Sequence, residues 1–161
     1  MKLETLNDLY VEELRDLYSV ENQILKALPD MVKAAHSPDL KVGFESHLRQ
    51  TQEHVSRLER IFDKMGQNPR GKFCKGMEGI LEEGKDLLKE KAEPDVLDAG
   101  LITAAQHVEH YEIAGYGTVR TYAKLLGQNE AATLLQQTLN EEEQTDQKLT
   151  QLSTRINVEA R

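Results

Sequence analysis

The chain has 161 residues, of which 39% are hydrophobic and 30% are charged, and its formal net charge is −8 at pH 7. This size fits one domain with a sizeable core, and the four prolines, ten glycines and absence of Trp argue against all-β and collagen-like classes. The acidic balance speaks against a nucleic-acid partner, and no stretch approaches the roughly 20 apolar residues of a membrane span, so we expect a soluble cytoplasmic protein.

The first half of the chain predicts a pair of long helices. Apolar residues recur at helical spacing over residues 3–35 and again over residues 38–65. Pro29 interrupts the first stripe without shifting its phase, so we expect a kink there rather than an end. Ser37, followed by proline, has the residue type of an N-cap, and Gly66 suits a left-handed C-cap. The short joint between the two helices predicts an antiparallel pair.

A long connection follows the second helix. Its first part, residues 66–75, is rich in Gly, Asn, Pro and basic residues, and its second part predicts a short amphipathic helix over residues 77–91. Cys74, the single cysteine, excludes an intrachain disulfide. We expect this region to be exposed, and we interpret Cys74 as a small packing residue rather than a reactive thiol.

The second half of the chain predicts another helical hairpin, over residues 95–126 and 130–157, joined at Gly127. Gly115 and Gly117 lie inside the third long helix, and we expect them to permit close helix approach rather than to break the helix. Two hairpins joined by a long crossover predict an all-α four-helix bundle, with a short extra helix in the crossover, as a single domain over residues 1–161.

Charged and imidazole side chains stand on the inward stripes near the middle of every long helix. An unpaired buried charge costs several kcal/mol, so such groups are normally paired, protonated or bound to metal. Because the helix rises 1.5 Å per residue, mid-helix positions of antiparallel neighbours lie at a similar height. The residues in question are Glu21 on the first helix, His54 on the second, Glu109 and Glu112 on the third, and Glu142 or Glu143 with Asp146 on the fourth.

Carboxylates and imidazole that converge from four helices predict a carboxylate-bridged dinuclear metal site. Two close cations need several negative ligands, and hard oxygen ligands suit Fe or Mn. The reference pattern has one Glu on each of two helices and Glu-x-x-His on the other two. Here Asp146 stands in place of a His on the fourth helix, and Thr51 stands where the second helix should carry a Glu. Gln50 is the nearest replacement, so the completeness of the second-helix ligand set stays open.

Each of these residues also has a plainer interpretation. Residues 141–143, taken alone, are equally well a solvated acidic face, and a lone His is more often a surface residue than a ligand. We interpret His107 and His110 as surface residues, His110 with the further option of orienting a carboxylate. The tyrosines are interpreted as core residues with hydrogen-bonded hydroxyls. Tyr18, one turn before Glu21, is the tyrosine that we consider for a role near the metal site.

Several segments spread over nearly the whole chain carry a family resemblance: residues 17–23, 34–40, 47–51, 74–79 and, above all, 106–117 with the sequence QHVEHYEIAGYG. They resemble the YciE/YciF family of bacterial stress-associated proteins. The resemblance implies a ferritin-like, rubrerythrin-related bundle, often dimeric, associated with general or osmotic stress. It also implies a dinuclear site at Glu21, Glu109, Glu112, the Glu142/Glu143 pair and Asp146.

Two functions remain open from the sequence. The first is a ferritin-like di-iron (or manganese) protein that acts on O₂ or peroxide. Because the chain has no Cys-x-x-Cys pair for a rubredoxin-type iron centre, such a protein would need an external electron donor. The second is a non-enzymatic stress or binding protein with a vestigial or incomplete metal site, which the missing second-helix carboxylate favours. For both we expect a homodimer.

Overall fold

The computed structural model describes residues 3–161; Met1 and Lys2, which the expected domain includes, lie outside the described residues. The part of the chain that it describes forms five helices and no strand: α1 (Leu6–Ala34), α2 (Pro38–Met65), α3 (Lys75–Leu87), α4 (Pro94–Leu125) and α5 (Asn129–Glu159). The bounds of α2 are the predicted ones, whereas α3 begins two residues before the predicted residue 77 and ends at Leu87 rather than at residue 91.

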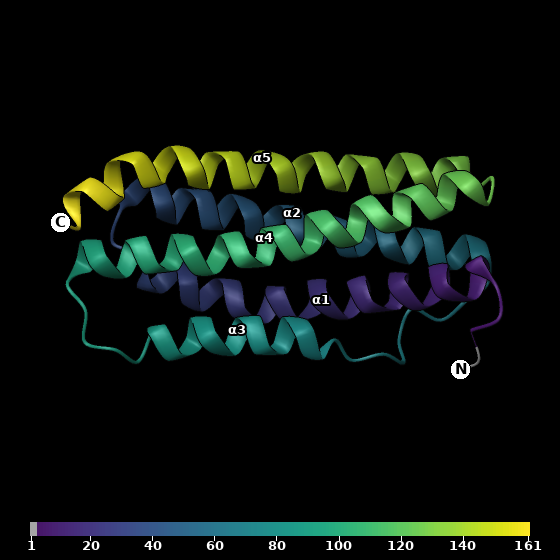
Figure 1. Cartoon of the computed structure of the whole chain (residues 1–161), viewed down its shortest axis with the longest axis horizontal. Coiled ribbons are helices and arrows are strands. Elements are labelled where there is room, and N and C mark those ends of the chain that lie inside the picture. The colour runs from purple at the N-terminus through teal and green to yellow at the C-terminus, as the bar shows by residue number, and fades with distance from the viewer. Residues whose placement is uncertain (1–2) are drawn as a thin grey trace.

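The four long helices run along one axis, and α3 lies outside them (Figure 1). Helix α1 packs on α2 and α4 packs on α5, while contacts between α1 and α4 and between α2 and α5 close the bundle. Helix α3 packs on α4 and α1. This arrangement confirms the all-α bundle of two hairpins with a short helix in the crossover. None of the helices in residues 3–161 is long and apolar enough to cross a membrane.

Local capping explains why the first hairpin forms where the sequence predicts it. Ser37 is the N-cap of α2, with its side chain accepting from the backbone of Leu40, and Gly66 ends the helix with φ 63°. Helix α1 continues through Pro29 and does not end there. The joint before α2 is fixed by buried Asp98 of α4, whose carboxylate accepts hydrogen bonds from the backbone N–H groups of residues 36 and 37 at 2.8 and 2.6 Å.

The expectation that the region of Cys74 is exposed is wrong for Cys74 itself, which is 2% exposed. The backbone N–H of Cys74 donates to Ser19 Oγ at 2.9 Å, and Sγ accepts from the backbone of Met77, which makes Cys74 the N-cap of α3. Its Sγ also lies 3.0 Å from the hydroxyl of Tyr111. These contacts draw the end of the crossover loop onto α1 and α4.

The two glycines inside α4 behave differently. A Cβ added at Gly115 would lie 2.8 Å from Cδ2 of Leu17, so this glycine permits the close approach of α1 and α4, as predicted. A Cβ at Gly117 would meet no atom within 4 Å. The expectation of a close approach is therefore wrong at Gly117.

The apolar core is divided into two halves along the bundle axis. One half contains Tyr10, Leu58 and Val119, and the other contains Phe44 and Leu101. The residues between the two halves on each long helix are the mid-helix positions at which the sequence places charged groups. The fold therefore brings these polar positions together between two apolar layers.

Candidate metal centre

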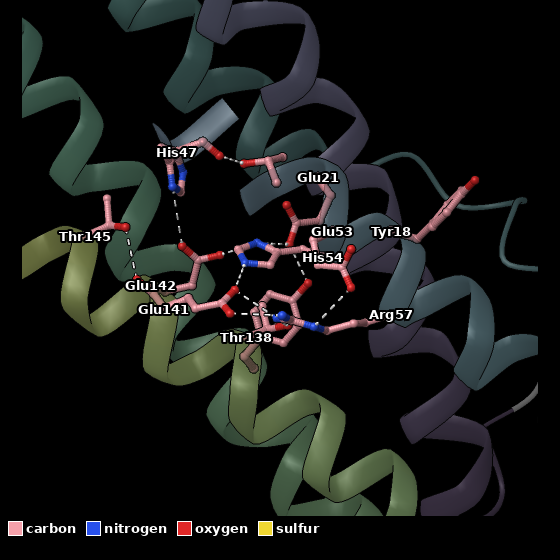
Figure 2. A network of polar contacts seen from close by, with 12 residues as sticks. Tyr18, Glu21, His47, Glu53, His54, Arg57, Thr138, Glu141, Glu142 and Thr145 are labelled. Atoms are coloured by element: carbon pink, nitrogen blue, oxygen red, sulfur yellow. Dashed lines mark hydrogen bonds and ion pairs between the residues drawn. The ribbon is translucent and has the colours of Figure 1, made fainter. Parts of the chain in front are cut away.

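Six polar side chains fill the space between the two halves of the core, and each is at most 3% exposed. They come from all four long helices. We call them the buried cluster: Glu21 of α1, His47 and His54 of α2, Glu109 and Glu112 of α4, and Glu142 of α5. Figure 2 shows the two imidazoles pointing toward the carboxylate of Glu142.

Glu142 lies between the two imidazoles. Its Oε1 lies 2.9 Å from Nδ1 of His54, and its Oε2 lies 4.0 Å from Nδ1 of His47. Each imidazole also faces a second carboxylate: Nδ1 of His54 lies 3.4 Å from Oε1 of Glu21, and Nε2 of His47 lies 3.1 Å from Oε1 of Glu109. One carboxylate thus joins two imidazole–carboxylate groups.

The same residues form two candidate ligand sets. In each set, one oxygen or nitrogen atom per residue lies within 4.8 Å of those of the other members. The first set is His47, Glu109, Glu112 and Glu142, and the second is Glu21, His54 and Glu142. Glu142 belongs to both sets, which is the arrangement that a bridging carboxylate of a dinuclear centre requires.

The buried cluster contains many polar atoms without hydrogen bonds. Both carboxylate oxygens of Glu112 and of Glu142 and both ring nitrogens of His47 are buried without a directed hydrogen bond. The short approaches between His and Glu atoms inside the buried cluster meet the distance of an ion pair but not the angles of a hydrogen bond. Buried polar atoms are normally satisfied, so this donor set fits a bound cation, and its oxygen-rich chemistry fits iron or manganese.

Burial dominates the electrostatics of the carboxylates on α1 and α4. It raises the pKa of Glu109 and of Glu112 well above the ordinary value, and the charges of Glu142 and Glu21 raise both further. The pKa of Glu21 is also raised, chiefly by burial, although His54 opposes the shift. Without a cation, Glu109 and Glu112 therefore favour the protonated form.

The contacts of His54 shift its own pKa and that of Glu142 against the effect of burial. Burial alone would lower its pKa, but the charge of Glu21, the hydrogen bond that His54 donates to Glu141 and the close carboxylate of Glu142 outweigh it and raise the pKa to about 12. Burial would likewise raise the pKa of Glu142, but His54 outweighs it and the pKa is lowered. Burial lowers the pKa of His47. The metal-free cluster thus holds an imidazolium–carboxylate pair at His54 and Glu142, beside a neutral His47.

A second layer of contacts orients His54. Its Nε2 lies 2.7 Å from Oε2 of Glu141, and Arg57 donates to both oxygens of that carboxylate at 2.8 and 2.9 Å. Burial would raise the pKa of Glu141, but the hydrogen bonds from His54 and Arg57 lower it to about 2. Because ionised Glu141 only accepts, Nε2 of His54 must donate, which leaves Nδ1 as the atom that faces the cluster. Figure 2 shows this chain of contacts.

The structure brings some of the predicted site residues together and leaves others apart. Glu21, His54, Glu109, Glu112 and Glu142 meet in the buried cluster. Gln50 is only half-buried, and Glu143 is exposed. Asp146 is partly buried, accepts a hydrogen bond from Gln106 at 3.0 Å and lies 3.2 Å from Nε2 of exposed His110. These three residues lie outside the buried cluster, and His110 approaches a carboxylate that is not part of it.

Sequence reasoning missed His47 because its apolar neighbour Leu48 fits the apolar periodicity of residues 38–65 equally well. In the structure the buried face of α2 contains His47, Thr51 and His54, and Leu48 is only half-buried. The seven-residue spacing from His47 to His54 was the available signal, since it places both imidazoles on one face.

The tyrosine at the cluster is also not the one expected. Tyr18 donates to Glu59 near the surface at 3.0 Å, whereas the buried hydroxyl of Tyr116 donates to Oε1 of Glu21. Tyr116 lies one turn after Glu112 on the buried stripe of α4, and this spacing was the available signal.

Comparison with known proteins places these observations in a family. The family model described as "Domain of unknown function (DUF892)" matches residues 5–160. Protein YciF of Escherichia coli (strain K12) is 39% identical over 154 residues, which cover 95% of this chain and 93% of that protein. The crystal structure of the E. coli stress protein YciF matches with a TM-score of 0.92 and 38% identity, over 96% of this chain and 98% of the other.

A more distant structure tests the fold alone. It is described as a ferritin-like, diiron-carboxylate protein from Bacillus anthracis, and it is 17% identical with a TM-score of 0.72. The match covers 93% of this chain and 99% of that one. With the YciF match, it confirms the ferritin-like fold that the resemblance implied.

Proposed function

The chain belongs to the DUF892 family, and we propose that its buried cluster binds two metal ions, iron or manganese, as the centre of a stress-response protein that acts on O₂ or peroxide. The stress role rests on the likeness to the E. coli stress protein YciF. The proposal includes a cytoplasmic location and a homodimer. It also includes an external electron donor, because a single cysteine cannot supply a rubredoxin-type iron centre.

The position of Glu142 is the observation that carries the proposal. Its two oxygens face different imidazoles, and it is the one residue common to both candidate ligand sets. Four carboxylates in a buried space would be strongly unfavourable without compensation. Two cations bridged by Glu142 would offset their charge and satisfy the oxygen and nitrogen atoms that lack hydrogen bonds.

The six residues of the buried cluster would bind the two ions in two groups that share one carboxylate. His47, Glu109 and Glu112 would hold one ion, Glu21 and His54 the other, and Glu142 both. When bound, a redox-active metal pair would supply the electron transfer that reduction of O₂ or peroxide requires.

The surrounding groups position the ligands and hold protons. Glu141, clamped by Arg57, keeps Nδ1 of His54 directed at the cluster. Burial raises the pKa of Tyr116 well above its ordinary value, so the hydroxyl keeps its proton and donates it in a hydrogen bond to Glu21. The two apolar halves of the core flank the cluster along the bundle axis.

A non-enzymatic role is the second candidate, and one observation favours it. Thr51 occupies the buried position at which the reference pattern has a carboxylate, and its hydroxyl donates to the backbone carbonyl of His47 at 3.0 Å. The second ligand set therefore has only Glu21 and His54 besides the shared Glu142. On this interpretation the protein is a helical stress or binding module whose interior charges are held by His54 and by protonated carboxylates.

Anaerobic titration with Fe(II), followed by exposure to air, distinguishes the two candidates. The proposed function predicts saturable uptake of Fe(II), new near-ultraviolet absorption on oxidation, and consumption of O₂ or peroxide when a reductant is present. Uptake of Fe(II) without any spectral change or oxidant consumption would leave a metal-binding module and contradict the oxidoreductase. The Glu143→Gln variant is the matched control for Glu142→Gln in this titration, because this exposed carboxylate lies next to Glu142 but outside the buried cluster.

A further inference from the structure

A cavity of about 420 Å³ lies inside the bundle beside the buried cluster. Its wall takes residues from all five helices, among them Leu28 of α1, Phe44 of α2, Leu81 of α3, Val108 of α4 and Leu149 of α5. The side chains of the deep wall are mostly aliphatic. Both the volume and the apolar lining fall in the range of small-molecule binding sites in proteins.

The wall of the cavity takes residues from opposite sides of the bundle. Its rim contains exposed residues of α2 and α5, such as Val42 and Lys148, whereas its opposite wall contains Leu81 of α3. Helix α3 packs on α1 and α4, on the far side of the bundle from α5 in Figure 1. A space that reaches from the α2–α5 rim to α3 therefore suits an extended chain.

The deep part of the cavity contacts the buried cluster. His47 and Glu109, 3% and 1% exposed, are both wall residues. Both ring nitrogens of His47 and Oε2 of Glu109 lack hydrogen bonds, so polar atoms with unused bonding capacity stand at the wall of an otherwise apolar space. A molecule in the cavity would be close to one of the two candidate ligand sets.

The rim of the cavity has one uncompensated charge. Asp39 is paired with Arg155 at 2.8 Å, so its carboxylate is already neutralised. No carboxylate of residues 3–161 lies within ion-pair distance of the Lys148 ammonium. The rim therefore presents a free cation at the entrance to an aliphatic space, which is the complement of an amphiphile with an anionic head.

We propose that this cavity binds an aliphatic monocarboxylate, with its carboxylate at Lys148 and its chain extending inward toward His47 and Glu109. Binding needs only the cavity and Lys148. That the chain is also presented to a metal pair rests on the proposed function, and the two statements are tested separately below.

Calorimetric titration of the full chain with octanoate tests the binding, first as purified and then after dialysis against EDTA. We expect one site per chain in both preparations. Burial of the chain contributes about 0.8 kcal/mol per methylene, so butanoate should bind on the order of 100-fold more weakly than octanoate. Equal affinities for the two acids, or no binding of octanoate by the folded protein, would overturn the proposal.

Charge removal tests the orientation of the ligand. The Lys148→Gln variant should weaken octanoate binding about two- to five-fold, as expected for a partly exposed ion pair, and should leave 1-octanol binding unchanged. Lys124→Gln removes the same charge from an exposed lysine of α4 that is not a wall residue, and it should change neither. Equal effects of the two variants on octanoate would overturn the placement of the carboxylate.

A steric variant tests the position of the chain. Gly43 is a wall residue, and a Cβ added there would meet no atom within 4 Å, so Gly43→Phe begins in open space and directs its ring at the cavity wall. Gly117→Phe is the control, because a Cβ there also meets nothing within 4 Å and Gly117 is not a wall residue. We expect Gly43→Phe alone to reduce octanoate affinity at least ten-fold, on the order of the loss of two methylenes. Unchanged affinity would contradict the site.

The proposals of metal binding and of octanoate binding can be contradicted independently of each other. Octanoate binding by a chain that takes up no metal would support the cavity proposal and contradict only the proposed function. Metal binding by a chain that does not bind octanoate would support the proposed function and contradict only the cavity proposal.

Discussion

Nδ1 of His54 lies 2.9 Å from Oε1 of Glu142, in a buried contact that lacks the angles of a hydrogen bond. The other oxygen of Glu142 faces His47 at 4.0 Å. The contact couples two candidate ligand sets through one carboxylate, and it makes Glu142 the residue on which the account of this centre depends.

Loss of Glu142 should therefore affect both ions at once. We expect Glu142→Gln to take up fewer than one ion per chain under conditions in which the unchanged protein takes up two, because both ligand sets lose a negative oxygen donor. Elemental analysis after gel filtration measures the difference. Glu143→Gln should retain full uptake, and equal losses in the two variants would argue against a bridging role for Glu142.

Glu112 should stabilise the metal-bound protein and destabilise the metal-free one. Both of its carboxylate oxygens are buried without hydrogen bonds, and burial raises its pKa well above the ordinary value. We expect Glu112→Met to increase the free energy of unfolding in EDTA by about 1–3 kcal/mol, because an apolar side chain replaces an unsatisfied polar one. Urea denaturation with and without metal measures both effects; the variant should lose the stabilisation by metal. A large loss of stability in EDTA would contradict this interpretation of Glu112.

The contact between Glu141 and His54 should tune metal affinity without contributing a ligand. Partners of this kind typically account for 10–100-fold in affinity, so we expect Glu141→Gln to weaken binding within this range. Competition with a chromophoric chelator measures the change. Glu53→Gln is the control, because Glu53 is 58% exposed and approaches Arg57 only at 3.8 Å. An unchanged affinity in Glu141→Gln would show that His54 needs no such partner.

The close approach of α1 and α4 predicts opposite effects at two glycines of one helix. In Gly115→Ala the new methyl would lie 2.8 Å from Cδ2 of buried Leu17, so overpacking should outweigh the gain in helix propensity and lower stability by about 1 kcal/mol. Gly117→Ala has open space and should raise stability by up to about 1 kcal/mol. Thermal unfolding of the two variants compares them directly, and a stabilised Gly115→Ala would contradict the close approach.

Much of the fold could be predicted because its determinants are local. The helical period, the Ser37 and Gly66 caps and the short joints are readable within a few residues of sequence, and α2 has the predicted bounds. The burial of Cys74 could not be predicted in this way. It depends on Ser19 and Tyr111, which are distant in sequence and approach only when the crossover folds back onto the bundle.

The candidate site shows the same division. Carboxylates on apolar stripes predicted Glu21, Glu109 and Glu112 as members of one buried group. The choice between Glu142 and Glu143 stayed open, because neighbouring residues differ by about 100° around a helix and only the packing of α5 selects the inward one. The same one-residue ambiguity hid His47.

Metal content per chain tests the central claim most directly. The protein, purified without an affinity tag, would be incubated anaerobically with Fe(II) or Mn(II), passed through a desalting column and analysed for metal and protein. The account predicts close to two ions per chain, with a higher unfolding temperature than in the EDTA-treated protein, since a ligand that binds only the folded state stabilises it. Metal well below one ion per chain, with no change in unfolding temperature, would contradict a dinuclear centre in the buried cluster.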